Sequence, residues 1–294
     1  MTAAAVQAGG TPAGQPRGRA LRRLLREPLG LVGLGLVVLM VTGAALADVV
    51  SPADPRALDL RARHAPPSLT HPLGTDHLGR DLLARVLHGG RLALQVSLSS
   101  VGLALAVGLT LGVLAGYGTP SLDHGLVLVF DAVRSFPTIM FALALVTLFG
   151  PSLTSIIVVV VVTSIPVYGR VARTQTQSIR TYEFILAARA LGAGMPRVLA
   201  GHILPNVVAP LLILASMEIP VVVTIESGLS FLGVGIRPPT PTWGSILNDG
   251  YTFIRETPWP VIAGGLPLML TTLGFTFLGE ALRDVFDPRL RREA

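Results

Sequence analysis

The sequence contains no cysteine and no lysine, and each absence excludes a class of site. Without cysteine there can be no disulfide bond, no iron–sulfur cluster and no thiolate metal site. All 23 basic residues are arginine. A phosphate-binding loop of the G-x-x-x-x-G-K-[ST] type needs a lysine that reaches the β- and γ-phosphates. The chain is therefore not itself an ordinary P-loop ATPase.

Charged residues are also scarce. Only 14% of the 294 residues are charged and 51% are apolar, whereas a soluble domain has about 25% charged residues. Several apolar runs reach the roughly 20 residues that cross a hydrocarbon core about 30 Å thick. The net charge of +6 comes from arginines that cluster beside these runs, which is how arginine sets membrane orientation. We therefore expect an all-α polytopic membrane protein with membrane lipid around it and no nucleic-acid partner.

Six membrane-spanning helices are predicted, with both chain termini in the cytoplasm. Residues 1–28 are predicted to form a disordered, basic cytoplasmic tail, and residues 29–50 the first helix. An extracytoplasmic loop at 51–91, a five-helix core at 92–282 and a cytoplasmic tail at 283–294 follow. The core spans are expected at about 92–117, 125–149, 153–173, 206–232 and 259–281. Arginines are more frequent on the predicted inner side, although the long outer loop carries six and weakens this agreement.

The first apolar run has two interpretations. Its basic flank and the Ala45-Leu46-Ala47 sequence at its end resemble a secretory signal with a cleavage site. Its length of roughly 20 residues is long for a signal and favours a membrane helix that is retained.

Proline and glycine occur inside the predicted spans. Neighbouring helices can satisfy the carbonyl groups that a proline frees within a membrane bundle. The prolines concerned are Pro137, Pro166, Pro210, Pro220 and Pro267. The spacing Gly108-x-x-x-Gly112-x-x-x-Gly116 predicts close packing of one helix on another, rather than a specific dimer interface.

A more polar segment, residues 176–205, separates two of the apolar runs. We expect an amphipathic helix from Thr176 to Leu191, ended by Gly192 and Gly194. Its apolar positions recur every three to four residues: Ile179, Tyr182, Leu186 and Ala190. Pro196 suits the first turn of a short second helix, which we expect to end at Pro205. The segment is predicted to form an αα-hairpin on the cytoplasmic face, and an ordinary cytosolic loop with an interfacial helix is the alternative.

The hairpin resembles the coupling signature of ABC importer permeases. That signature is E-A-A-x-x-x-G, followed nine residues later by I-x-L-P, and the matching residues are Ala187, Ala188, Gly192, Leu204 and Pro205. Leu186 replaces the glutamate of the family and His202 replaces its isoleucine. The resemblance implies that this segment docks into a groove of an ATPase subunit. Glu183, one turn before Leu186, and Arg189 are candidates for polar contacts there.

Three further segments resemble the dipeptide/oligopeptide/nickel branch of these permeases. They are His71-Pro72-Leu73-Gly74-Thr75-Asp76-x-x-Gly79-Arg80-Asp81, Gly228-Leu229-Ser230-Phe231-Leu232-Gly233-Val234-Gly235, and Leu282-Arg283-Asp284-x-x-Asp287-Pro288-Arg289. The extra N-terminal helix and its long outer loop look like the C-type permease of such systems. The resemblance implies a type I ABC importer permease (MetI-like) fold and no catalysis or cofactor in this chain. It also implies a homologous B-type permease, two ABC ATPases that bind ATP and magnesium, and an extracytoplasmic substrate-binding protein.

Two carboxylates, Glu218 and Glu226, fall within the fifth span. A charge at the bilayer centre costs about 2.5–3.5 kcal/mol on insertion scales. They have three possible roles: lining a translocation path, forming an interhelical hydrogen bond, or relaying protons in a secondary transporter. Glu226 lies close to the predicted outer end of the span, where it would reach water.

The remaining polar and aromatic candidates carry weaker signals. Four histidines in the first outer loop have irregular spacings that favour a structured loop over a metal site: His64, His71, His77 and His88. Trp243 and Trp259 are expected near the membrane interface. Asp131 and Arg134 are spaced to pair along one helix.

The sequence therefore predicts the permease subunit of an ATP-driven importer for di- and oligopeptides. A permease of the same family for nickel or another small solute is an alternative. A proton-coupled secondary transporter is the alternative from a different class.

Overall fold

The computed structural model describes residues 27–286, and regular structure within them is helical. This confirms the predicted all-α fold. The tails at 1–26 and 287–294, with the basic clusters predicted there and the end of the C-terminal motif, lie outside the described residues.

The chain forms long helices joined by short helical segments. In order they are α2 (Pro28–Ala45), α3 (Ala47–Val50), a 3-10 turn (Leu60–Ala62), α4 (Leu82–Tyr117), α5 (Pro120–Arg134), α6 (Thr138–Phe149), α7 (Leu153–Ile179), α8 (Glu183–Ala190), α9 (Met195–Val198), a π-helical turn (Leu199–Ile203), α10 (Leu204–Phe231), α11 (Trp243–Thr252) and α12 (Trp259–Phe286). By length and composition, five helices of the described chain can cross a membrane, and α5 with α6 makes a sixth if that bent pair counts as one span.

The third span is broken rather than continuous. We predicted one helix over 125–149, but α5 and α6 meet at an angle of 86°. The break falls at Ser135–Pro137, since proline disfavours the helical conformation of the residue before it. Pro137 instead precedes α6 as its N-cap residue. Pro166, Pro210, Pro220 and Pro267 lie inside continuous helices, as predicted.

Helices α4 and α11 at the loop end differ from the prediction. Helix α4 begins at Leu82 rather than residue 92, because the Asp81 carboxylate accepts a hydrogen bond from the Ala84 amide at 2.7 Å and caps the helix. The outer loop is correspondingly shorter. Helix α11 was not predicted. A capping box starts it: the Thr242 hydroxyl accepts from the Ser245 amide at 3.0 Å, and the Ser245 hydroxyl accepts from the Thr242 amide at 3.1 Å.

The predicted glycine stripe is the centre of the bundle. Gly108, Gly112 and Gly116 on α4 face α7, and these two helices share the most extensive contact in the described chain. A Cβ atom at Gly108 would lie 2.6 Å from the Cβ of Tyr168, and one at Gly116 would lie 2.7 Å from the Cβ of Thr176. The stripe therefore permits close packing within this subunit, as predicted.

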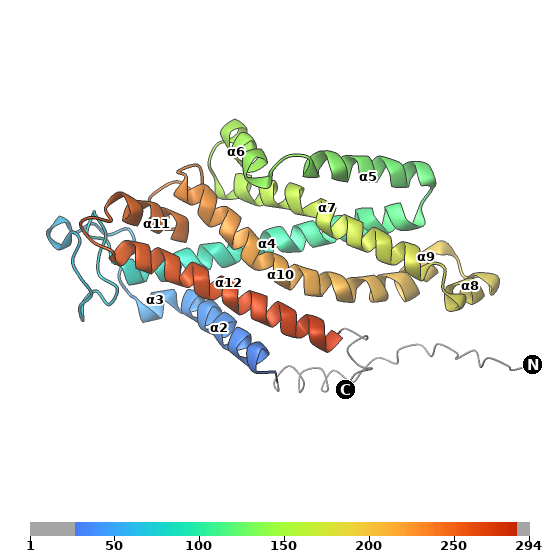
Figure 1. Ribbon diagram of the computed structural model, residues 1–294, viewed down its shortest axis with the longest axis horizontal. Coiled ribbons are helices and arrows are strands. Elements are labelled where there is room, and N and C mark those ends of the chain that lie inside the picture. Colours follow the sequence, from blue (N-terminus) through green and yellow to red (C-terminus); the bar gives the residue numbers. More distant parts are fainter. Residues whose placement is uncertain (1–26, 287–294) are drawn as a thin grey trace, which may run out of the picture.

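The helices form an elongated bundle with two different long sides (Figure 1). Helix α2 lies along one side against α12, and α5 with α6 lies along the opposite side against α7. Helix α10 packs between α4 and α12. Residues 51–81 and α11 lie together at one end, called the loop end below. Residues 180–203, with α8 and α9, lie at the other end, called the hairpin end.

Candidate functional site

The hairpin end is built around a tight turn at Gly192. Its φ of +84° is the left-handed conformation that glycine adopts readily. The Gly192 amide donates to the Arg189 carbonyl and the Ala193 amide donates to the Ala188 carbonyl, both at 3.0 Å. This pair of bonds is a Schellman motif, which satisfies the last carbonyls of α8. The predicted role of Gly192 as the helix stop is thus confirmed.

The first arm of the hairpin is shorter than predicted. A continuous helix from Thr176 to Leu191 was expected, but α7 ends at Ile179 and α8 starts at Glu183. The break shifts the phase of the apolar face. Ile185 is fully buried, while Tyr182 and Leu186 are about half exposed. Leu186 and Tyr182 were therefore wrongly assigned to the packed face.

The second arm does not end at Pro205. It starts at α9 with Pro196 in its first turn, as predicted, but continues through the π-helical turn into α10. Pro205 lies in the first turn of α10, where a missing amide hydrogen is tolerated. The Asn206 side chain donates to the His202 carbonyl at 2.6 Å. Because the helix is unbroken, movement of the hairpin would be transmitted directly to a membrane-spanning segment.

The two arms extend the main apolar core of the bundle. Ile185 of α8 packs in the same buried cluster as Val198 and Ile203 of the second arm. The ring of Phe184 meets the ring of His202 edge-on at 6.0 Å between centroids. Leu204 is partly buried against the same cluster. His202 and Leu204 thus hold the hairpin together rather than forming its tip.

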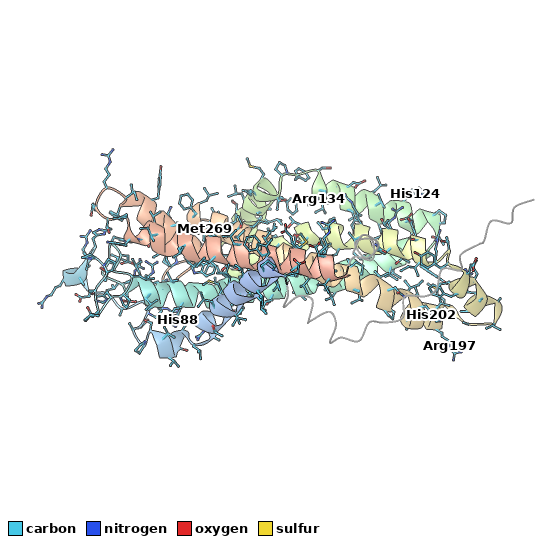
Figure 2. The ribbon with its side chains drawn as sticks, turned by 60° about the horizontal axis from the view of Figure 1, so that its bottom comes forward. His88, His124, Arg134, Arg197, His202 and Met269 are labelled. Atoms are coloured by element: carbon cyan, nitrogen blue, oxygen red, sulfur yellow. The ribbon has the colours of Figure 1, made fainter. Side chains whose placement is uncertain are left out.

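The tip presents apolar and basic side chains outward. Leu191 is 89% exposed, and Met195 and Leu186 are about half exposed. Glu183, Ala187, Arg189 and Pro205 are exposed, and Ala188 is partly exposed. Figure 2 shows Arg197 and His202 at this end and His88 towards the opposite end of the molecule. The sequence-predicted residues therefore lie on one compact unit, with only some of them on its outer surface.

A cavity separates α8 from the end of α4. It measures about 340 Å³ and is lined by Tyr117, Arg180, Thr181, Leu186 and Arg189. The Arg180 guanidinium donates to the Gly116 carbonyl at 2.9 Å. Two cationic groups on one cavity favour an anionic side chain as its occupant. Leu186, which replaces the acidic residue of the coupling signature, forms part of the same wall.

The loop end holds a buried ion-pair network, called the loop-end cluster below. It consists of Asp76, Arg80, Arg85 and Asp249. Arg80 Nε lies 2.6 Å from Asp76 Oδ2, and Arg85 Nη1 contacts the same carboxylate. Both arginines also reach Asp249 Oδ2 on α11, at 3.1 Å and 3.0 Å. The cluster therefore ties the outer loop and the start of α4 to α11, which are far apart in the sequence.

The charges of this cluster control its protonation. Burial by itself would raise the pKa of Asp76, but the Arg85 and Arg80 guanidinium groups and two backbone amides outweigh it and lower that pKa. His77, which stacks on Phe253 at 4.9 Å between ring centroids, lies 3.8 Å from Asp249. Burial lowers the pKa of His77.

Asp76, His77 and Asp249 come close enough to hold a metal ion. However, Arg80 and Arg85 already neutralise both carboxylates, so the cluster is a set of ion pairs.

Comparisons with known proteins place this chain in a family. Residues 108–292 match the family described as "Binding-protein-dependent transport system inner membrane component". Residues 15–67 match the "N-terminal TM domain of oligopeptide transport permease C". The dipeptide transport system permease protein DppC of Alkalihalophilus pseudofirmus is 36% identical over 94% of this chain and 91% of its own length. This chain belongs to the binding-protein-dependent transport permease family.

Solved transporters show the same fold. An inward-facing structure of the MetNI methionine ABC transporter aligns with a TM-score of 0.57 at 20% identity, covering 69% of this permease and 97% of that chain. An amino acid ABC transporter crystallised with histidines aligns with a TM-score of 0.50 at 16% identity, covering 67% and 91%. The predicted MetI-like fold is confirmed.

Family membership also defines the kind of subunit. A permease of this family is a non-catalytic, multi-pass membrane component of an ABC importer, and ATP hydrolysis belongs to partner subunits. It works with a second permease, ATPase subunits and a substrate-binding protein. The predictions of an ABC permease and of a non-enzyme are confirmed on these grounds.

The two membrane carboxylates of the permease have different surroundings. Glu218 is partly exposed and accepts a hydrogen bond from the Ser164 hydroxyl of α7 at 3.2 Å. Glu226 is fully buried and accepts from the Ser230 hydroxyl at 2.7 Å and the Ser227 hydroxyl at 3.3 Å, both on its own helix. The expectation that Glu226 reaches water is wrong, because the packed bundle buries its side chain completely.

Two smaller expectations for the permease are also corrected, and one motif histidine gains a structural role. Trp243 is not an interfacial anchor; it is buried, and its indole donates to the Val86 carbonyl at 2.9 Å. Asp131 pairs with Arg170 of α7 at 2.6 Å rather than with Arg134 on its own helix. His71 lies 2.9 Å from the Asp81 carboxylate that caps α4, so this motif histidine supports the start of a helix.

Proposed function

We propose that this permease is the C-type membrane subunit of an ATP-driven importer of di- and oligopeptides. The observation that carries the proposal is the similarity to DppC, which is named as a dipeptide permease, over nearly the whole of both chains. The partners proposed are a homologous B-type permease, two ABC ATPases and an extracytoplasmic substrate-binding protein. ATP and magnesium bind in the ATPases, and this chain binds no cofactor. It lies in the bacterial cytoplasmic membrane with both termini in the cytoplasm.

The hairpin end is the proposed handle for the ATPase. A half-exposed or fully exposed cluster of apolar side chains on one small unit is a common mark of a protein interface. Leu186, Leu191 and Met195 form such a cluster beside the cavity that contains Arg180 and Arg189. The complementary groove of the ATPase would offer apolar surface and a carboxylate. Leu186 stands where the family signature has a glutamate. In this permease, the charge at the contact with the ATPase would come from Arg180 and Arg189.

The proposed translocation path runs along the side formed by α5, α7 and α10. Asp131 on α5 and Arg170 on α7 form an ion pair whose side chains are 58% and 43% exposed. A charged pair within membrane-spanning helices is costly against lipid, so this side faces water or another subunit. On the opposite side, the exposed large side chains of α2 are apolar: Leu29, Leu31, Val32, Val38, Leu39 and Val41. That side faces lipid.

Glu218 is proposed to line this path. Its carboxylate is partly exposed and lies between α7 and α10, bound by a single serine hydroxyl. An exposed carboxylate in a polar channel would attract the ammonium or amide groups of a peptide. Glu226 is closed off from solvent in this structure, and its two serine partners are on its own helix. We assign it a structural role.

The test is peptide-stimulated ATP hydrolysis by the purified complex, reconstituted with its binding protein. Ala188→Arg places a large cation where α8 approaches the partner, and we expect it to abolish stimulation while the subunits still insert in the membrane. Ala57→Arg, on the exposed outer loop, is the matched control and should leave peptide-stimulated hydrolysis unchanged. The proposal fails if Ala188→Arg couples normally.

Uptake into proteoliposomes distinguishes the importer from a proton-coupled transporter. Uptake by the importer persists when a protonophore collapses the proton gradient and ATP remains. Glu218→Gln should alter peptide uptake without removing ATP dependence. Two results would favour the proton-coupled class. The first is loss of uptake when the protonophore is added. The second is loss of uptake in Glu218→Gln and Glu226→Gln while Ala188→Arg has no effect. Uptake of nickel chelates but not peptides would leave the importer in place and correct its cargo.

A further inference from the structure

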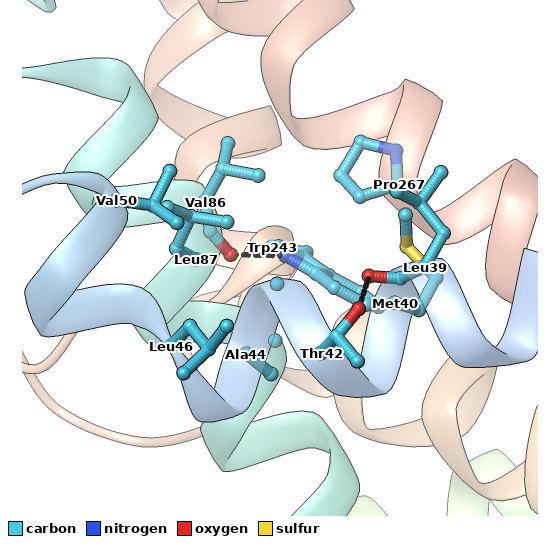
Figure 3. A pocket seen from close by; sticks show the side chains of 12 residues that line it. Leu39, Met40, Thr42, Ala44, Leu46, Val50, Val86, Leu87, Trp243 and Pro267 are labelled. Atoms are coloured by element: carbon cyan, nitrogen blue, oxygen red, sulfur yellow. Dashed lines mark hydrogen bonds between the residues drawn. The ribbon is translucent and has the colours of Figure 1, made fainter.

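An apolar groove lies between α2 and the rest of the bundle, towards the loop end (Figure 3). It has a volume of about 380 Å³, within the range of about 300–1,000 Å³ that is usual for ligand pockets. Its wall comes from α2, α3, α4, α11 and α12, and includes Met40, Gly43, Leu46, Leu87, Trp243 and Pro267. Leu39, Leu46 and Val50 at its rim are about half exposed, so the groove opens on the side that faces lipid.

The polar atoms of the groove wall are already satisfied by protein. The Thr42 hydroxyl donates to the Val38 carbonyl at 2.6 Å, and the Trp243 indole donates to the Val86 carbonyl at 2.9 Å. These bonds leave the wall with hydrocarbon surface for an occupant to contact. A hydrocarbon chain fits such a wall, whereas a polar ligand would lose hydrogen bonds to water and gain none.

A pair of opposite charges lies at the loop end of the groove. Arg91 follows the groove residue Gly90, and its guanidinium donates to the carbonyls of Ala44 and Ala45, both at 3.1 Å. Arg91 Nη2 also lies 3.0 Å from Asp48 Oδ2, and His88 Nε2 lies 3.1 Å from Asp48 Oδ1. The side chains of Asp48 and Arg91 are 70% and 43% exposed, so both charges can meet a headgroup.

We propose that this groove binds one acyl chain of a zwitterionic phospholipid that has a primary amine. Its phosphate would meet Arg91 and its ammonium would meet Asp48. The Asp48 carboxylate is ionised at neutral pH, and the hydrogen bond from Arg91 lowers its pKa further. Arg91 Nη1 makes no hydrogen bond to the part of the chain that the structure describes, and guanidinium groups bind phosphate well.

Headgroup and chain contribute differently to this site. Surrounding lipid tails are as apolar as the groove, so filling it with hydrocarbon gives little selectivity by itself. The paired charges supply the selectivity, because the lipid ammonium would add a second cationic partner to the exposed Asp48 carboxylate, and an anionic lipid without an amine has no such group. The bound lipid would fill the space between α2 and α4 and hold the first helix against the core.

The test measures lipid that stays bound to the whole complex after exhaustive detergent exchange, by native mass spectrometry. Gly43→Phe fills the groove from α2, since a Cβ atom there meets only the Leu87 side chain, at 3.4 Å. We expect the amount of bound phosphatidylethanolamine to fall by roughly tenfold or more. The lipid would lose the packing of its acyl chain in the groove and one charge-assisted contact of its headgroup. Leu46→Trp fills the same groove from a half-exposed position and guards against misfolding of the first variant. Gly35→Phe, on the same helix with open space around its Cβ, is the matched control and should keep the lipid.

Asp48→Asn tests the headgroup without filling the groove. We expect the preference for phosphatidylethanolamine over phosphatidylglycerol to fall by about tenfold, the size of one charge-assisted hydrogen bond. Unchanged lipid content in both groove-filling variants would overturn the proposal. So would an unchanged preference in Asp48→Asn. Loss of the second permease from the complex in Gly43→Phe, with lipid retained, would show that the groove binds protein.

Discussion

The two ends of this permease are stabilised in different ways. At the loop end, buried charges from the outer loop, α4 and α11 neutralise one another within the loop-end cluster. At the hairpin end, backbone bonds at Gly192 and the apolar packing of Ile185 hold two short arms, and the tip leaves Leu191 almost fully exposed. The charges of the loop-end cluster are neutralised within this chain, whereas the tip of the hairpin presents groups that a second protein would cover.

The largest effect should come from breaking the loop-end cluster. Arg85→Met would leave the fully buried Asp76 with one arginine in place of two. Removing one partner of a buried ion pair destabilises a protein by about 3–5 kcal/mol, and we expect a loss of this order in the denaturant unfolding of the purified complex. Arg56→Met changes an exposed arginine of the outer loop and should change stability little. Equal losses in the two variants would show that burial of the cluster adds nothing.

The next effect concerns the turn at the hairpin end. Gly192→Pro removes the amide that donates to Arg189 and cannot adopt a φ of +84°, so we expect a local cost of about 3 kcal/mol or more and loss of peptide-stimulated ATP hydrolysis. Gly192→Ala keeps the amide and pays about 1–2 kcal/mol for the left-handed conformation, so it should couple partially. Membrane insertion, measured by protease protection, should match the wild type in both. Full coupling by Gly192→Pro would contradict the rigid turn.

A smaller effect is expected at the exposed tip. Leu191→Ser removes an apolar side chain that is 89% exposed in this chain, so folding of the permease should not change. If an ATPase buries this leucine, its loss should cost about 1.5–3 kcal/mol, which weakens ATPase binding by roughly tenfold or more. Leu69→Ser changes a fully exposed leucine at the loop end and is the control. Equal ATPase affinity in both variants, measured by titration of the ATPase, would remove Leu191 from the interface.

The smallest effect is a pH dependence of the loop end. Burial lowers the pKa of His77 below the ordinary value of 6.5, so the unfolded chain binds more protons than the folded one near that pH. His77 should therefore stabilise the fold less as the pH falls below 6.5, and its contribution should be complete above it. His77→Phe keeps the stacking on Phe253 and removes the titration. We expect its thermal midpoint to fall less than that of the wild type between pH 7 and pH 5, and parallel curves would disprove the role of His77.

The outcome at individual residues shows which patterns were informative in advance. The glycine stripe of α4 and the glycine turn of the hairpin were predicted correctly, because close approach and positive φ depend on the absence of a Cβ atom at those positions. The packed face of α8 was predicted wrongly, because a three-residue break before Glu183 changes its phase. The continuation through Pro205 was also missed, since a π-helical turn before the proline keeps the helix intact.

Composition, run length and motif order were sufficient for the class of this protein: a polytopic helical permease with a polar hairpin between two spans. These properties depend on local chemistry, on the cost of placing polar groups in lipid and on segments that keep their order along the chain. The tertiary structure alone decided that Arg80 and Arg85 meet Asp249 across more than half of the sequence, that Trp243 of α11 is buried against α4, and that a groove opens beside Gly43. Such contacts depend on how helices pack side by side, and periodicity within one helix does not specify which partner its faces will meet.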